Sequence, residues 1–252
     1  MSKWLWLSLP LLFVPAAVIA DEDDDADGVD AELVEEGGYP EVSGNIGFGF
    51  TASSGNTESA TTRLRASTKV EYVRWRHRFD VSGFRTEEGG DTTADKRSGS
   101  AQSDLKISER SYLFANVNGE RDRFGAFERR YSASLGVGRR FIDTATMDLD
   151  LEVGGGRRYE RAQGADETES EAIARFHGVY DWQFADNSSF LQDVEVEAGS
   201  DNTYTESETA IRSRLTQSIS WTLSYVVQHN STVPEGREKT DSFTSITLDY
   251  DF

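Results

Sequence analysis

The stretch DSFTSITLDYDF, Asp241 to Phe252, decides the fold. From Ile246 onward, apolar residues occupy every second position and polar residues occupy the positions between them. A period of two is typical of a β-strand that has one apolar and one polar face. The pattern runs to Phe252 without tapering into polar residues, although an exposed apolar edge strand is an aggregation hazard. We therefore predict a strand that has no free edge, as in a closed barrel.

The same alternation recurs from Glu41 onward in about twelve segments. The connections between these segments alternate between two kinds. Tight ones are expected near Arg74, Glu109, Asp143, Asp186 and Ser218. Mostly longer and more polar ones are expected near Gly55, Gly89, Gly125, Gly164, Asn202 and Gly236. Short turns at one end and longer loops at the other are the plan of an outer-membrane barrel. The sequence thus predicts an all-β fold with a single antiparallel transmembrane β-barrel over residues 39–252.

A soluble β-sandwich is the alternative, because its strands alternate in the same way. Sandwich strands usually run nearer six residues than the ten or so expected here. The composition also favours the barrel, since 11% of the residues are aromatic and 28% are charged while only 37% are hydrophobic. That balance suits strands that face lipid on one side and water on the other.

The N-terminal residues predict export. Residues 1–20 combine an early lysine, an uncharged apolar run and a small-residue exit, which is typical of a secretory signal peptide. Residues 21–38 follow as an acidic tail, in which Asp21 to Glu36 holds ten acids and no base. Such a density of like charge predicts a disordered, periplasmic segment. Its opening resembles a calcium-binding loop, but the twelfth position is Val34 where that loop needs a glutamate.

The polar face of the strands carries many charges of both signs, and in a barrel this face lines the interior. These charges are expected either to pair across neighbouring strands and fill the lumen or to line a narrow water-filled path. The candidate lumen-lining residues are Arg63, Arg65, Lys69, Arg76, Arg78, Asp148, Asp150, Glu152, Arg212 and Arg214.

Several stretches resemble the salt-induced outer membrane protein family, a bacterial family of unknown function. They are SGNTES (54–59), YLFANVNGERDRF (112–124), EAGSDNTYTESETA (197–210) and HNSTVPEGREKTDSFTSITLDYDF (229–252). The resemblance implies a barrel in the outer membrane of a Gram-negative bacterium, and the family name implies induction by salt. It carries no catalytic residues. The partners predicted for an outer-membrane barrel are outer-membrane lipid, lipopolysaccharide and the barrel assembly machinery, which would read Tyr250 and Phe252 as a C-terminal signal.

No cofactor, metal or nucleic-acid partner is expected. The three histidines lie on different predicted strands and the chain has no cysteine. Paired glycines such as Gly136 and Gly138, and the run from Gly154 to Gly156, lie inside strands rather than at a strand-to-helix turn. They are therefore expected to relieve crowding in a curved wall rather than to cradle a phosphate.

A non-enzymatic role, as a narrow pore or an envelope-stabilising protein, is the favoured interpretation. The alternative is a lipid hydrolase of the outer leaflet, similar to lipid A deacylases or phospholipases. Its catalytic residues would be His229 as base and Ser231 as nucleophile, two positions apart on the outward face. Asp241 is the nearest candidate for a third member, but its position in the alternation places it on the other face.

Overall fold

A computed structural model describes residues 40–53 and 58–252. Twelve β-strands form this part of the chain. They are β1 (Glu41–Ser53), β2 (Ser59–Glu71), β3 (Trp75–Glu88), β4 (Asp91–Lys106), β5 (Ser111–Asp122), β6 (Phe127–Asp143), β7 (Met147–Ala162), β8 (Glu169–Ala185), β9 (Ser188–Gly199), β10 (Thr203–Arg214), β11 (Ile219–Asn230) and β12 (Thr240–Asp251). The described residues include no helix of the length and apolarity needed to span a membrane.

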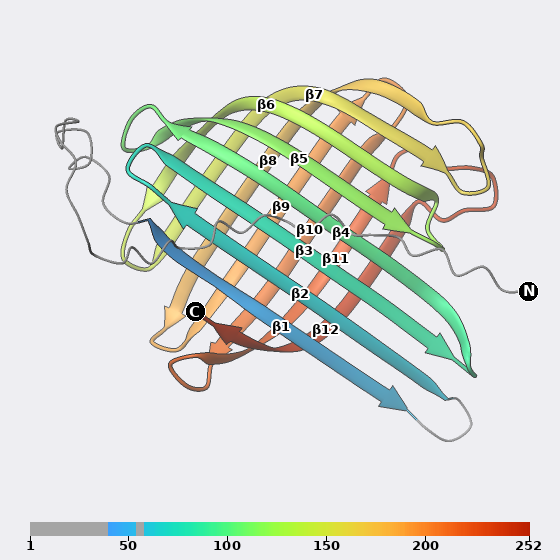
Figure 1. The fold of residues 1–252 in the computed structure, drawn as a ribbon, viewed down its shortest axis with the longest axis horizontal. Helices are drawn as coiled ribbons and strands as arrows, with labels where there is room; N and C mark the ends of the chain where they lie inside the picture. Colours follow the sequence, from blue (N-terminus) through green and yellow to red (C-terminus); the bar gives the residue numbers. More distant parts are fainter. Residues whose placement is uncertain (1–39, 54–57) are drawn as a thin grey trace, which may run out of the picture. The chain divides into compact units, whose positions relative to one another are not determined.

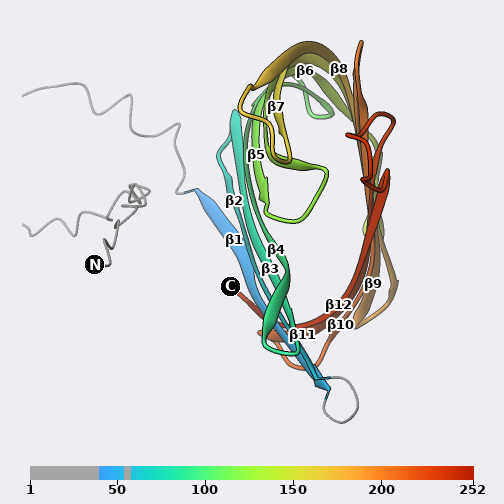
Figure 2. The same cartoon turned by 90° about the vertical axis from the view of Figure 1, so that its right-hand side faces the viewer.

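Each strand pairs antiparallel with its sequence neighbours, and β1 pairs with β12, so the sheet closes into a barrel (Figure 1). Figure 2 looks along the wall and shows β2 to β5 on one side of the ring and β9 to β12 on the other. The predicted all-β barrel of about twelve strands is confirmed.

The closing seam between β1 and β12 is short. It contains four registered residue pairs, from Asn45↔Asp251 to Phe48↔Leu248. The last residue extends the seam, because the amide of Phe252 donates to the carbonyl of Gly44 at 3.0 Å and the amide of Gly44 donates back at 2.9 Å. The terminal strand therefore has a hydrogen-bonded partner up to its final residue.

The two faces of the wall differ in chemistry as the alternation requires. Leu135 points outward and is 68% exposed, whereas its neighbour Ser134 points inward and is 4% exposed. The same contrast holds at the C-terminus, where Ile246 and Leu248 are exposed and Thr247 is buried. The buried residues are mostly polar or charged, which reverses the arrangement of a water-soluble protein. The barrel consequently has a polar core and an apolar exterior.

The connections define two ends of the barrel. The tight-turn end carries residues 72–74, 107–110, 144–146, 186–187 and 215–218. The loop end carries residue 58 and residues 89–90, 123–126, 163–168, 200–202 and 231–239. The expectation of longer loops fails at 89–90 and at 200–202, which contain two and three residues. Gly89 and Gly90 both have positive φ angles, of 58° and 90°, and such a pair forms a two-residue hairpin turn that follows the strand twist.

The predicted signal peptide (1–20) and acidic tail (21–38) lie outside the described residues, as does most of the connection around Gly55.

Candidate functional site

Glu152 of β7 is the centre of a buried cluster inside the barrel, and only 2% of its surface is exposed. Both carboxylate oxygens accept hydrogen bonds from side chains on four other strands. The partners are Arg78 of β3 (2.9 Å), Gln102 of β4 (2.7 Å), Tyr112 of β5 (3.0 Å) and Arg175 (2.8 Å) and His177 (3.2 Å) of β8. One carboxylate therefore joins five strands of the wall.

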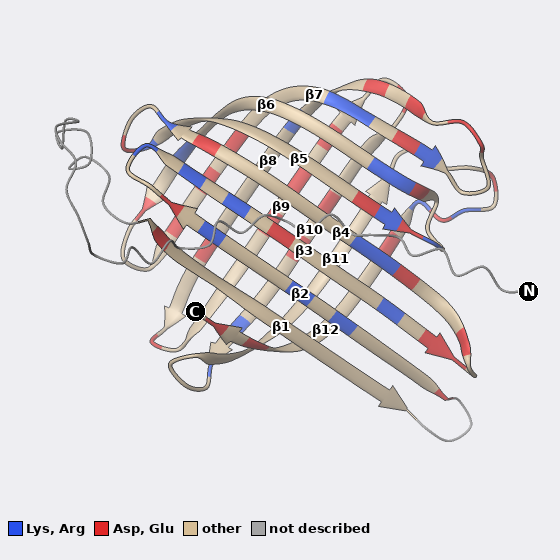
Figure 3. Ribbon diagram, viewed as in Figure 1, with Lys and Arg blue, Asp and Glu red and all other residues tan. Residues whose placement is uncertain are grey.

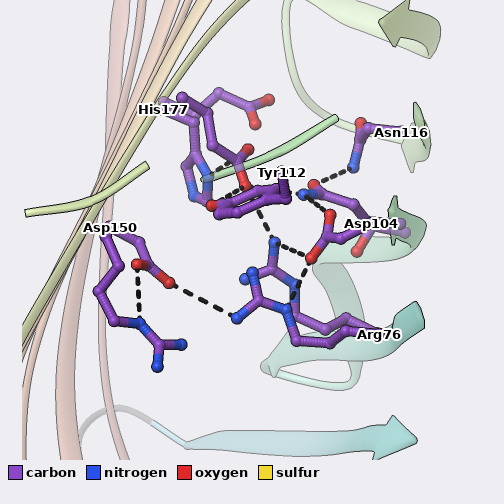
Figure 4. A network of polar contacts seen from close by, with 12 residues as sticks. Arg76, Asp104, Tyr112, Asn116, Asp150 and His177 are labelled. Atoms are coloured by element: carbon purple, nitrogen blue, oxygen red, sulfur yellow. Dashed lines mark hydrogen bonds and ion pairs between the residues drawn. The ribbon is translucent and has the colours of Figure 1, made fainter. Parts of the chain in front are cut away.

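Arg76 extends this cluster toward the tight-turn end. Its Nε donates to Asp104 at 2.7 Å, and its Nη1 lies 3.7 Å from a carboxylate oxygen of Asp150. Its guanidinium also lies 4.8 Å from the centre of the Tyr112 ring, so the cation has an aromatic neighbour as well as two anions. Figure 4 shows Arg76 between Asp104 and Asp150, with Tyr112 nearby. We call these residues, together with Glu152 and its partners, the Glu152 cluster.

A second buried cluster surrounds Arg158 of β7, nearer the loop end. The Arg158 side chain is fully buried and lies close to three carboxylates. The distances are 2.6 Å to Glu171, 3.3 Å to Glu160 and 3.4 Å to Glu197. A guanidinium offers five donors in a planar fork, so one arginine can contact several carboxylates at once. The Arg158 cluster joins β7 to β8 and β9.

Other polar contacts cross the lumen instead of following the wall. Arg130 of β6 donates to Asn230 of β11 at 2.6 Å, although five steps of the strand order separate these strands. Arg130 also lies 2.6 Å from Glu160 and 3.8 Å from the centre of the Tyr204 ring. A charged group removed from water needs such partners, because burying it unpaired is costly. These bridges hold opposite walls together.

A cavity of about 470 Å³ remains inside the barrel beside the two clusters. Its lining includes six basic residues, Arg63, Arg65, Arg78, Lys96, Arg130 and Arg175. It also includes seven acidic residues, Asp80, Glu120, Asp193, Glu195, Glu197, Glu206 and Glu208. Arg65 of β2 reaches Glu208 of β10 at 3.2 Å, and both side chains stay partly exposed. The interior is thus packed with charge around the two clusters and hollow beside them.

The ten predicted lumen-lining residues fall into four groups. Arg76, Arg78, Asp150 and Glu152 belong to the Glu152 cluster, while Arg63 and Arg65 line the cavity. Lys69 pairs with Glu71 at 3.2 Å, and Arg212 bonds to Asp251 and to Ser220. Asp148 and Arg214 are exposed residues close to the tight-turn end.

The candidate set missed several residues that the structure brings into the interior. Arg130, Tyr112 and His177 each make buried or half-buried polar contacts there. The alternation contained the signal, because each of them adjoins an outward apolar residue, as Arg130 adjoins Tyr131. In the part of the chain that the structure describes, no group of three or more His, Cys, Asp or Glu side chains is arranged to hold a metal ion.

The geometry gives the lipid-hydrolase alternative no support. His229 Nδ1 bonds to the hydroxyl of Thr240 at 2.8 Å. The Ser231 hydroxyl accepts from the amide of Thr203 at 2.8 Å and donates to Asn202. A nucleophile and its base need a hydrogen bond to each other, whereas here each side chain is engaged elsewhere.

A family model described as "Protein of unknown function, DUF481" matches residues 46–252, which is almost the whole barrel. The chain belongs to this family. A similar protein is "Uncharacterized protein YdiY" of Escherichia coli (strain K12), which is 29% identical over 211 residues. The match covers 82% of both chains. The expected resemblance to an outer-membrane family of unknown function is confirmed at this level.

Solved structures similar to this DUF481 protein are outer-membrane barrels. The NanC porin is 11% identical, with a TM-score of 0.48, over 84% of this chain and 98% of that one. The KdgM porin in complex with disordered oligogalacturonate is 12% identical, with a TM-score of 0.45, over 82% of this chain and 99% of that one.

Proposed function

We propose that this DUF481 protein is a non-enzymatic barrel of the bacterial outer membrane that forms a narrow pore for ions and small polar solutes. The observation that carries the proposal is the charged cavity inside a barrel whose exterior is apolar. Such a wall is stable only where hydrocarbon covers the outside and water or polar side chains fill the inside.

The strand lengths support a membrane-spanning wall. The strands contain 12 to 17 residues. At about 3.4 Å per residue the shortest is about 41 Å long, and a tilt of about 45° reduces its vertical span to about 29 Å. This matches the hydrocarbon core of a bilayer, which is about 30 Å thick. The wall therefore crosses a bilayer with its polar ends in the two headgroup regions.

Paired spin labels test this placement. Cysteines at Leu135 and Leu248 will be accessible to oxygen in a refolded, lipid-embedded barrel, because both side chains point outward. Cysteines at the adjacent inward residues Ser134 and Thr247 will be shielded from oxygen. The measurement is relaxation of the label by oxygen and by a polar nickel complex. Equal oxygen accessibility at all four positions would contradict a lipid-facing exterior.

The pore itself is tested by single-channel recording in planar bilayers. We expect small conductance steps, because the two clusters fill much of the lumen, and little preference between cations and anions, because the cavity lining holds seven acidic residues, six arginines and lysines, and His177 paired with Asp193. The double variant R63Q/R65Q removes two of these cations and will produce a cation preference, seen as a shift in reversal potential across a salt gradient.

The control for this variant is R74Q/R110Q, which removes two exposed arginines from connections at the tight-turn end and leaves the cavity lining intact. Its reversal potential will match that of the unmodified protein. A folded, inserted barrel that conducts no ions would contradict the pore and leave the envelope-stabilising role.

The proposal also includes the orientation of the barrel, its assembly and its expression. The tight-turn end faces the periplasm and the loop end faces the medium, as in barrels with short periplasmic turns. Tyr250 and Phe252 are read by the barrel assembly machinery. Induction by salt, which the family resemblance implies, is tested by comparing transcript levels at low and high osmolarity.

A further inference from the structure

Four arginines on four adjacent strands form a continuous row at the loop end. Arg97 of β4 is the registered partner of Arg121 of β5, which is also the partner of Arg129 of β6. Arg129 is in turn the partner of Arg161 of β7. Residues directly opposite each other in antiparallel strands have Cβ atoms about 4.5–5.5 Å apart. These four residues, which we call the arginine row, therefore bring four guanidinium groups together on one surface.

The arginine row faces outward. The inward neighbours of these residues are Lys96, Arg130 and Glu160. Lys96 lies 2.9 Å from Glu120, and Arg130 pairs with Glu160 as described above. Because side chains alternate along a strand, the row itself points away from the lumen. The side chains of Arg97 and Arg121 are 73% and 59% exposed. In Figure 3, Lys and Arg segments gather at the loop end of β4 to β7.

The protein compensates this positive charge only in part. One carboxylate, Glu128, lies at the β-bulge of β6, 2.6 Å from Arg161, 3.7 Å from Arg129 and 3.9 Å from Arg121. Asp95 lies 3.4 Å from Arg97. Four cations thus share two anions, in a chain whose formal net charge is −19.

Unsatisfied donors mark the same place. The Nε atoms of Arg129 and Arg161 are buried and have no hydrogen-bond partner among the described residues. Like charges placed directly opposite each other in a sheet are destabilising, and so are buried donors without partners. A bound anion with several oxygen atoms would relieve the repulsion between the guanidinium groups.

The surface next to the row suits a lipid. Tyr131 and Tyr159 are registered partners one step toward the tight-turn end, and both are exposed. Beyond them lie the exposed apolar residues Val117, Leu135 and Val153 on β5, β6 and β7, with the exposed Arg157 of β7 between Tyr159 and Val153. Aromatic side chains above an apolar surface are typical of the level where headgroups meet acyl chains. On β6 the order from rim to centre is therefore cation, aromatic, apolar.

The opposite wall lacks this arrangement. At the loop end of β9 to β12, the outward positions are occupied by Ala198, Thr205, His229 and Thr240. The arginine row therefore has no counterpart at the outward strand positions of β9 to β12, which distinguishes a binding site from a belt that surrounds the whole rim.

We propose that the arginine row binds the phosphorylated saccharide headgroup of lipopolysaccharide, with the acyl chains lying along the apolar residues of β5 to β7. This inference rests on the proposed outer-membrane placement, in which the loop end lies at the outer leaflet. Arginine forks bind phosphate oxygens in pairs, and several phosphates on one rigid headgroup match several arginines in a row.

Binding is measured by native mass spectrometry of the refolded barrel in a neutral detergent with added lipopolysaccharide. The test variant is R97Q/R121Q/R129Q, which removes three row cations and keeps the Arg161–Glu128 pair. The charge-matched control is R74Q/R110Q/R139Q, which removes three exposed arginines from the tight-turn half. We expect the unmodified protein and the control to bind one lipopolysaccharide alike and the test variant to bind at least about tenfold more weakly, because several charge-assisted hydrogen bonds are lost.

Two further binding measurements identify the ligand. Dephosphorylated lipopolysaccharide should bind the unmodified protein as weakly as intact lipopolysaccharide binds the test variant. Inorganic pyrophosphate at equal concentration should not displace the lipid, since it lacks acyl chains. Equal affinity of the test and control variants, undiminished binding of the dephosphorylated lipid, or full displacement by pyrophosphate would each overturn the proposal. Binding is measured in detergent, so this result does not depend on whether the barrel conducts ions.

Discussion

Replacing Glu152 with alanine will lower the free energy of unfolding of the barrel by about 3–5 kcal/mol, the usual cost of removing one partner from a buried ion pair. The loss is large because Arg78 and Arg175 would remain in the interior without this carboxylate, and Gln102 and Tyr112 would lose an acceptor. The measurement is equilibrium unfolding by urea of the refolded barrel in lipid vesicles, followed by the heat-modifiable gel shift.

The matched control is Glu87→Ala. Glu87 also pairs with an arginine, Arg85, at 2.6 Å, but both side chains are about half exposed. An exposed pair contributes about 0–1 kcal/mol, so this variant should unfold close to the unmodified protein. Glu152→Gln keeps the shape and part of the hydrogen bonding, and its loss should fall between the two alanine variants. If Glu152→Ala and Glu87→Ala unfolded at the same urea concentration, the Glu152 cluster would not be a structural centre.

Replacing Gly156 with valine will prevent most of the chain from refolding, at a cost of at least about 3 kcal/mol, the upper end of ordinary overpacking. A Cβ atom at Gly156 would lie 2.0 Å from the backbone oxygen of Ala133 and 2.7 Å from the Cα of Ser134. Both atoms belong to the backbone of β6, so no side-chain rotation can relieve the clash. β6 and β7 would have to separate where Ser134 is the registered partner of Gly156.

The preceding residue provides the control. A Cβ atom at Gly155 would have no neighbour nearer than the Ile173 backbone oxygen at 3.5 Å, and the residue is exposed on the outward side. Gly155→Val should therefore refold with a stability within about 1 kcal/mol of the unmodified protein, the range of strand propensities. The fraction refolded in detergent is read from the gel shift. Similar refolding of both variants would show that the wall tolerates a side chain inside this strand.

Much of the architecture was readable from alternation alone. Because side chains in a strand point to opposite faces in turn, Ile246, Leu248 and Tyr250 had to share one face and Thr247 and Asp249 the other. The same rule gave the number of strands and the inward placement of residues such as Arg76 and Glu152. The length of individual connections was harder to predict, since Gly89 and Gly90 supply a turn so compact that no longer loop is needed.

Among the inward charges, the sequence could not indicate which would meet. Arg65 and Glu208 are 143 positions apart, and Lys96 and Gln228 are 132 apart, yet each pair is hydrogen-bonded across the lumen. These contacts depend on the diameter of the barrel and on the register of every intervening strand pair, which arise only when the sheet closes.

The sequence by itself determined the identity of the two faces, because the period of two is a local property of the extended backbone. Only the tertiary structure decided that the interior packs around Glu152 and Arg158 and stays hollow beside Arg65 and Glu208. Only the register aligned four arginines from four strands into one outward row. The physical reason is that a side chain's direction depends on its own strand, whereas its partners depend on how all twelve strands are offset against one another.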